Sequence, residues 1–292
     1  MTDFMHFLET TFGPLVLVFT VSNLAAMGLQ VRASEVAVAL RDWKSVALIF
    51  AWGWLLGPAL GLLITWALPL AEPFVIVVLL ASLAPCAPFL QQMVEKARGD
   101  MGFAGAFIPL VTIGTVVLMP VMGPLLIHGL AIDAWALAQP LLLTILLPLL
   151  VGAALRHFAE SAATRLFPAL KRLALLSTLL TVVWCLALYG EGMLDTAGSL
   201  ALLSMTLFMV GMGAITYRFG FGMKQEQRSV MSLGMGTRNI AAVLAAALAI
   251  PDGDPRIVVM VVLWTLWSVV LAALGARFFC KRAGASLEGA AA

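Results

Sequence analysis

The chain has 292 residues, of which 62% are hydrophobic and 11% are charged, whereas soluble domains are about 45–50% apolar and about 25% charged. Its 17 basic and 15 acidic residues give a net charge of +2, which excludes the strongly basic surface of a nucleic-acid-binding protein. Three cysteines, Cys86, Cys185 and Cys280, are too few and odd in number for an extracellular disulfide scaffold. These proportions predict a polytopic membrane protein.

Apolar segments long enough to cross a bilayer as a helix, which takes about 20 residues, recur along the chain. In chain order the nine segments cover residues 12–30, 45–69, 73–92, 101–127, 134–155, 169–189, 198–217, 229–250 and 257–279. They are continuously apolar and do not alternate, which favours helices over the strands of a β-barrel. Residues 1–11 carry Asp3 and Glu9 and no basic residue, so we expect a permanent first span and not a cleaved signal.

Basic residues fall in every second connection between these segments. Fifteen of the 17 lie on one side: Arg32, Arg41, Lys44, Lys96, Arg98, Arg156, Arg165, Lys171, Arg172, Arg218, Lys224, Arg228, Arg277, Lys281 and Arg282. The other side has Arg256 alone. Because cytoplasmic loops hold the Lys and Arg excess, the pattern predicts an N-terminus outside and a C-terminus in the cytoplasm of a bacterial inner (plasma) membrane.

The last basic residue, Arg238, lies inside the eighth span, where no acidic residue occurs between Glu226 and Asp252. An Arg in the bilayer costs about 2.5–3.5 kcal/mol on insertion scales, and such residues commonly mark a substrate path. Three roles are open for Arg238. The guanidinium could contact a substrate anion, hold the interrupted segment closed by donating to backbone carbonyls, or extend to the membrane surface.

Helix breakers and polar residues cluster in two spans. In the span 73–92 they are Pro85, Cys86, Pro88, Gln91 and Gln92. In the span 229–250 they are Gly234, Gly236, Thr237, Arg238 and Asn239. Proline removes a backbone donor, and glycine permits unwinding and close approach. Two interrupted spans in matching places of two halves predict the central site of a transporter.

The halves match if an inverted repeat of five plus five helices lacks its first helix. The first repeat is then residues 12–128, with four helices and a break near 84–92. The second is residues 134–280, with five helices and a break near 232–239, and residues 281–292 form a cytoplasmic tail. The predicted fold is therefore an all-α membrane protein with nine transmembrane helices and an inverted-repeat transporter architecture.

Several short motifs occur in a characteristic order over residues 13–280. They are Met27-Gly28-Leu29, Leu83-Ala84-Pro85, Ala97-Arg98-Gly99-Asp100, Met119-Pro120, the run from Leu146 to Gly152, and Gly234-Met235 followed by Asn239. Together they resemble the bile acid/sodium symporter family. The resemblance implies two broken helices that cross at mid-membrane, and a core domain that moves against a panel domain made of the first, fifth and sixth spans.

The resemblance implies a secondary transporter that moves a small organic anion by alternating access, with no cofactor and no enzymatic activity. Its partners are the substrate, membrane lipid and, where coupling exists, sodium or a proton. Sodium-coupled members hold the cation with polar side chains that fall here on Leu90, Gln91, Ala104 and Ile108, and with an acid in the second broken helix. Too few oxygen ligands remain, so sodium coupling is not expected.

The predicted substrate-binding residues are Arg238, Asn239, Thr237, Gln91, Gln92, Ser22 and Asn23, and the predicted crossover backbone is Pro85, Cys86, Pro88, Gly234 and Gly236. No metal site is expected. For Ser22 and Asn23 a helix–helix hydrogen bond is an equal alternative, and for the glutamines a solvated helix end. The alternative functions are an arsenite-type efflux carrier that uses Cys86 and a non-transporting ligand sensor with the same fold.

Overall fold

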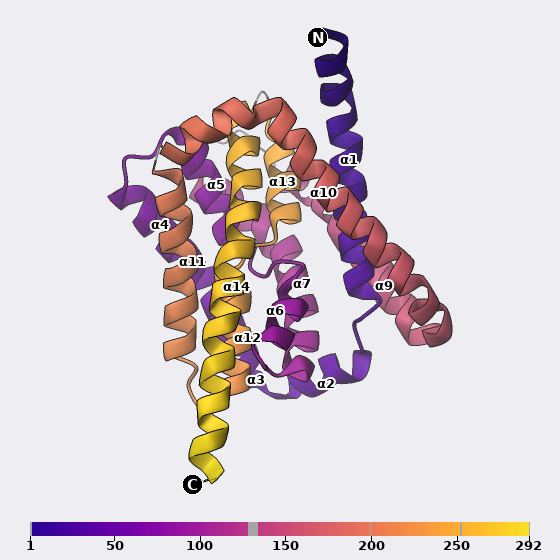
Figure 1. Cartoon of the computed structure of the whole chain (residues 1–292), viewed down its shortest axis with the longest axis vertical. Coiled ribbons are helices and arrows are strands. Elements are labelled where there is room, and N and C mark those ends of the chain that lie inside the picture. Colours follow the sequence, from indigo (N-terminus) through magenta and orange to yellow (C-terminus); the bar gives the residue numbers. More distant parts are fainter. Residues whose placement is uncertain (1, 128–133, 199, 252, 292) are drawn as a thin grey trace.

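A computed structural model describes residues 2–127, 134–198, 200–251 and 253–291 (Figure 1). Within these ranges every regular element is helical, and seven helices are long and apolar enough to cross a membrane. They run over Met5–Gly28, Trp43–Ala67, Met101–Leu126, Ala134–Phe158, Glu160–Gly190, Ala201–Arg218 and Pro255–Ala283. The prediction of an α-helical, polytopic membrane protein is thus confirmed.

These seven spans belong to longer or composite elements, which Figure 1 labels along the chain. They are α1 (Thr2–Gly28), α3–η1–α4 (Trp43–Ala51, Trp52–Leu56, Gly57–Ala67), α7 (Met101–Leu126), α8–η2–α9 (Ala134–Leu141, Leu142–Leu146, Leu147–Phe158), α10 (Glu160–Gly198), α11 (Ala201–Arg218) and α14 (Pro255–Ala291). A short helix, α2 (Ala33–Arg41), connects α1 to α3.

The other two apolar segments are each broken into two shorter helices. The first gives α5 (Glu72–Ser82) and α6 (Leu90–Lys96), and the second gives α12 (Gln225–Gly236) and α13 (Ile240–Leu248). Thr237 is extended, with φ −92° and ψ 161°, and the Asn239 side chain caps α13 by accepting from the Ala242 N–H. The first interruption covers residues 83–89, so that Gln91 and Gln92 lie in α6, and the second covers residues 237–239.

Two wide π-helical turns, η1 and η2, were not expected from the sequence. Each directly precedes a proline at the second position of the next helix, Pro58 in α4 and Pro148 in α9. Because proline has no N–H, the carbonyl four residues before it loses its helical donor, and the turn widens to i→i+5 bonding. In η1 the Gly57 N–H accordingly donates to the Trp52 carbonyl.

The helices α1, α9 and α10 pack together on one side of the molecule (Figure 1). The backbones of α1 and α9 meet at Gly28 and Gly152, where a Cβ on Gly152 would lie 2.5 Å from the Ala25 carbonyl oxygen. Small residues allow such close approach between membrane helices, whose association depends on packing. Glycine at both positions therefore sets the spacing of this helix pair.

We expect Gly152→Ala to destabilise the protein, because the added methyl collides with backbone that has no rotamer to change. The matched control is Gly13→Ala on α1, where a Cβ meets nothing within 4 Å; in a helix this exchange is neutral or stabilises by up to about 1 kcal/mol. Thermal unfolding in detergent measures both. Equal melting temperatures for the two variants would contradict the close contact.

Candidate functional site at the crossing of the two broken helices

The two breaks meet each other through their backbones. Pro85 and Arg238 form an isolated antiparallel bridge. On one side of it the Cys86 N–H donates to the Thr237 carbonyl at 2.9 Å, and on the other the Asn239 N–H donates to the Ala84 carbonyl at 2.8 Å. Each break therefore satisfies polar groups that the other leaves open, which is what non-helical backbone at membrane depth requires.

Cys86 and Thr237 strengthen this junction. Cys86 has a φ of 77°, in the left-handed region that few residues other than glycine adopt. In this conformation its N–H points at two acceptors, the Gly234 and Thr237 carbonyls, both at 2.9 Å. The Thr237 hydroxyl accepts from the Ala87 N–H at 3.1 Å and donates to the Leu233 carbonyl at 2.8 Å. Backbone strain at Cys86 is thus held by contacts with the second break.

Cys86 itself is buried, and its thiol makes a 3.7 Å contact with the Ala87 carbonyl. In the part of the chain that the structure describes, no three His, Cys, Asp or Glu residues come together as a metal site. Cys185 and Cys280 are also free thiols in this part. Nothing in this geometry gives Cys86 a thiol partner.

The glycines of α12 permit close packing and not the unwinding that the sequence suggests, because α12 stays helical through Gly236. A Cβ on Gly234 would lie 2.6 Å from the Phe107 ring carbon Cζ and 3.2 Å from Leu90. A Cβ on Gly236 would lie 3.1 Å from the Met209 carbonyl oxygen. These two positions bring α12 against α7 and α11, which fixes the place of the break.

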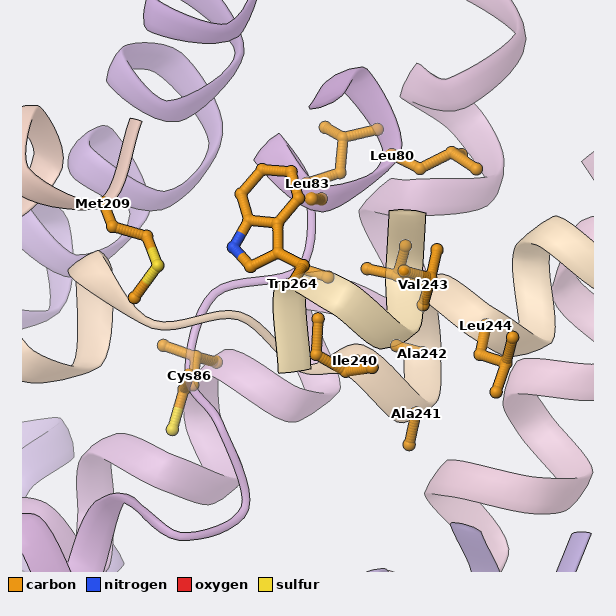
Figure 2. Close-up of a cluster of buried hydrophobic side chains, with 14 of the residues drawn as sticks. Leu80, Leu83, Cys86, Met209, Ile240, Ala241, Ala242, Val243, Leu244 and Trp264 are labelled. Carbon is orange, nitrogen blue, oxygen red and sulfur yellow. The ribbon is translucent and has the colours of Figure 1, made fainter. Parts of the chain in front are cut away.

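Apolar side chains seal the crossing. Trp264 of α14 is fully buried and lies beside the start of α13, between Met209 on one side and Val243 on the other (Figure 2). Leu80 and Leu83, from the end of α5, close the same cluster from above in that view. The polar groups of the crossing are therefore shielded from water, which makes each unpaired one costly.

Arg238 is the charged group of the crossing, and its side chain is 0% exposed. Its Nη1 donates to the Ala81 and Ser82 carbonyls at 3.3 and 3.4 Å, and its guanidinium lies 4.8 Å from the centre of the Phe208 ring. Among the described residues Nε and Nη2 have no hydrogen-bond partner. Of the three roles that the sequence leaves open, complete burial excludes an Arg that reaches the membrane surface.

The structure brings only some of the predicted site residues together. Thr237 and Asn239 flank Arg238 in the second break. Gln91 and Gln92 lie on α6, after the first break, whereas the guanidinium contacts the end of α5 before it. Gln91 is half-buried and Gln92 exposed. Among the described residues the guanidinium donates to the Ala81 and Ser82 carbonyls and to neither glutamine.

Ser22 and Asn23 connect α1 to α10. The Ser22 and Ser177 hydroxyls lie 3.2 Å apart. The Asn23 side-chain amide donates to the Phe19 carbonyl at 2.8 Å and to the Thr178 hydroxyl at 3.3 Å. These are the helix–helix hydrogen bonds of the alternative reading, and through Thr178 they border the recess described next.

A recess lies between the α1–α10 pair and the α13–α14 pair. Its lining residues are Phe19, Thr178, Thr181 and Val182 on one side and Ile240, Leu244, Val262 and Thr265 on the other. Ile240 and Leu244 are on the first turns of α13, directly after the second break. The recess was not predicted from the sequence. The sequence feature that points to it is a cluster of hydroxyl-bearing residues within an apolar span, namely Ser177, Thr178 and Thr181.

The sequence model described as the Sodium Bile acid symporter family matches residues 15–196, which run from α1 to α10 and include the first break. A probable sodium/metabolite cotransporter, chloroplastic BASS3 of Arabidopsis thaliana, is 23% identical over 233 residues, or 77% of this chain and 53% of the relative. The protein of the same name in Oryza sativa subsp. japonica is 23% identical over 229 residues, 77% of this chain and 54% of its own length.

The chain therefore spans about half the length of the curated relatives that it matches. The family match covers more than half of the chain and agrees with the resemblance seen in its motifs. The family is one of transporters and not of enzymes. On this evidence the chain belongs to the sodium bile acid symporter family.

Proposed function

We propose that the chain is a secondary transporter that moves a small organic anion across a bacterial inner membrane by alternating access. The observation that carries the proposal is the crossing of two broken helices at Pro85 and Arg238, deep in an apolar bundle. Broken helices that meet at the centre of a membrane bundle are the usual binding architecture of secondary transporters. Membership in a transporter family supports the same reading.

In this proposal the chain crosses the membrane nine times, with α5–α6 and α12–α13 each counted as one broken span. The start of α1, the end of α10 and the start of α11 lie at one end of the molecule, and α2, the α11–α12 connection and the end of α14 lie at the other (Figure 1). The second end carries the basic connections, among them Arg41 and Arg218. The positive-inside rule places that end in the cytoplasm.

A reporter that is active only in the cytoplasm, fused after Ala292, should therefore be active in intact cells. Fusion of the same reporter within the α10–α11 connection should be silent, because that connection is on the outer side. A silent fusion at Ala292 together with an active one in that connection would contradict the orientation.

Alternating access requires two groups of helices that move against each other. We assign α1, α8–α9 and α10 to the panel and the remaining spans to the core. The recess lies between these groups, with walls from α1 and α10 on one side and α13 and α14 on the other. Movement of the core relative to the panel would expose it to each side of the membrane in turn.

The chemistry around the recess favours an anion with an apolar body. Its walls are almost wholly apolar, because the hydroxyls of its three threonines, Thr178, Thr181 and Thr265, donate to carbonyls of their own helices. It borders the N-terminal turn of α13, where a helix carries about half a positive charge. Arg238 adds a full positive charge two residues before Ile240, without a carboxylate partner in the described parts of the chain. We propose that Arg238 attracts the anion through its charge, because its donor contacts go to backbone carbonyls.

We also propose that transport does not require sodium. The side chains of Leu90, Ala104 and Ile108, at the positions where sodium-coupled relatives are expected to carry polar ligands, are buried and apolar. Phe107 and Leu90 fill the space beside Gly234 with carbon atoms. A hard cation needs several oxygen ligands, and these side chains supply none.

The transport proposal is tested first by a thermal-shift screen of the purified protein against monocarboxylates, dicarboxylates, sulfonates and matched neutral and cationic compounds. Anions that stabilise the protein should then enter proteoliposomes. Val182→Phe should weaken binding at least tenfold, because Val182 lines the recess. The control is Val183→Phe, whose side chain is 54% exposed on the same helix. Hits confined to neutral or cationic compounds, or equal affinities for the two variants, would sink the proposal.

The sodium proposal is tested by replacing Na⁺ with choline at constant ionic strength and measuring the affinity for the anion found in that screen. We expect a change of less than twofold, since the protein lacks side-chain ligands for a mobile cation. A tenfold loss of affinity, about 1.4 kcal/mol of linkage, would show that sodium binds together with the substrate.

A further inference from the structure

The end of α5 presents a set of backbone carbonyls to the interior of the bundle. α5 stops at Ser82. The Leu80 and Ala81 carbonyls accept from the Leu83 and Ala84 N–H groups, both at 3.1 Å, but the Ser82, Leu83 and Ala84 carbonyls have no donor from a following turn. A helix C-terminus also carries about half a negative charge. Ser82, Leu83 and Ala84 are fully buried. Some donor or cation must therefore meet these oxygens, because a buried carbonyl without a partner is costly.

Every carbonyl from Ala81 to Ala84 receives a donor from a distant part of the chain. Arg238 Nη1 donates to the Ala81 and Ser82 oxygens. The Trp54 indole N–H, placed by the wide turn η1, donates to the Leu83 oxygen at 3.1 Å. The Asn239 N–H donates to the Ala84 oxygen at 2.8 Å. Among these donors Arg238 alone carries a charge, and it lies at the C-terminus of α5, where the helix carries its partial negative charge.

The surroundings of the guanidinium are those of a cation site. Two carbonyl oxygens accept hydrogen bonds from its Nη1. The guanidinium carbon Cζ lies 4.8 Å from the centre of the Phe208 ring, which is a cation–π distance. The guanidinium has no ion pair with a described carboxylate. α4 leaves room for this arrangement, since a Cβ on Gly57 would lie 2.8 Å from the Ser82 oxygen. Negative potential here comes from backbone and ring, as it does for a bound monovalent cation.

We propose that Arg238 is a tethered cation, which fills a cation site at the end of α5 and keeps the two broken helices closed on each other. The curated relatives are named sodium/metabolite cotransporters, and a mobile ion binds and leaves. A guanidinium on the second break cannot leave. That this fixed charge replaces a coupling ion rests on the proposed transport function, whereas the cation site itself does not.

Removal of the guanidinium should uncover this site. Arg238→Ala removes the donor to the Ser82 carbonyl and one of the two donors to the Ala81 carbonyl, which keeps the Ala84 N–H, and it opens a space beside the Phe208 ring. A small free cation should then take the place of the side chain and restore the closed crossing. The mutant protein, but not the wild type, should therefore acquire a cation dependence.

The experiment is thermal unfolding in detergent, without any transported substrate, in choline chloride, sodium chloride or choline chloride with millimolar guanidinium at one ionic strength. In choline, Arg238→Ala should melt about 5 °C or more below wild type, which corresponds to a few kcal/mol for a chain of this size. Sodium or guanidinium should restore at least half of that loss. Wild type and the control Arg277→Ala, an exposed Arg on α14, should melt alike in all three solutions.

Two results would overturn the proposal. One is an Arg238→Ala protein that melts with wild type in choline, and the other is a loss of stability that neither cation relieves. If Arg238→Ala does not accumulate, Arg238→Lys and Arg238→Gln decide: a cation site requires the lysine variant to be the more stable, and the reverse order refutes it. The unfolding experiment contains no substrate and is therefore independent of the proteoliposome uptake assay. If cations restore stability but no anion is taken up, only the transport proposal is refuted. If an anion is taken up but no cation restores stability, only the tethered-cation proposal is refuted.

Discussion

Two helices that stop inside an apolar bundle leave amide and carbonyl groups that water cannot reach, and this constraint organises the rest of the molecule. Pro85 and Pro88 lack N–H groups, so the first break is poor in donors. The second break supplies them, through the Asn239 N–H and the Arg238 guanidinium. In return, the Cys86 and Ala87 amides of the first break donate to the second. Neither break satisfies its polar groups alone.

Close packing around the crossing follows from this mutual dependence. Hydrogen bonds between breaks require the helices that carry them to be held at fixed separations. Glycine provides this where α12 passes Phe107 and the Met209 carbonyl. A proline-induced wide turn provides it where η1 directs Trp54 toward the Leu83 carbonyl. The apolar side chains around the crossing, among them Trp264, then exclude water, so each backbone carbonyl there needs a protein donor (Figure 2).

The sequence predicts those features that depend on neighbours along the chain. Continuous apolar runs indicate the spans, the prolines indicate the first break, and a lone Arg among apolar residues indicates a buried functional group. Contacts between distant residues are beyond such reasoning. Arg238 lies 157 residues from its acceptor Ala81, and nothing local shows whether its guanidinium turns to a carbonyl or to a substrate. The recess escaped prediction because its walls come from four helices, and the π-helical turns because a proline in a span indicates a kink without its form.

The positive charge of Arg238 connects the fold to the proposed function. This charge stabilises the end of α5 and is not neutralised by any carboxylate in the described parts of the chain. It also lies close to the start of α13, which borders the recess. The most direct measurement is a cryo-EM map, in sodium-containing buffer, that resolves side chains at the crossing. We expect guanidinium density on the Ala81 and Ser82 carbonyls, with no separate ion there. An ion or water on those carbonyls, with Arg238 turned into the recess, would contradict it.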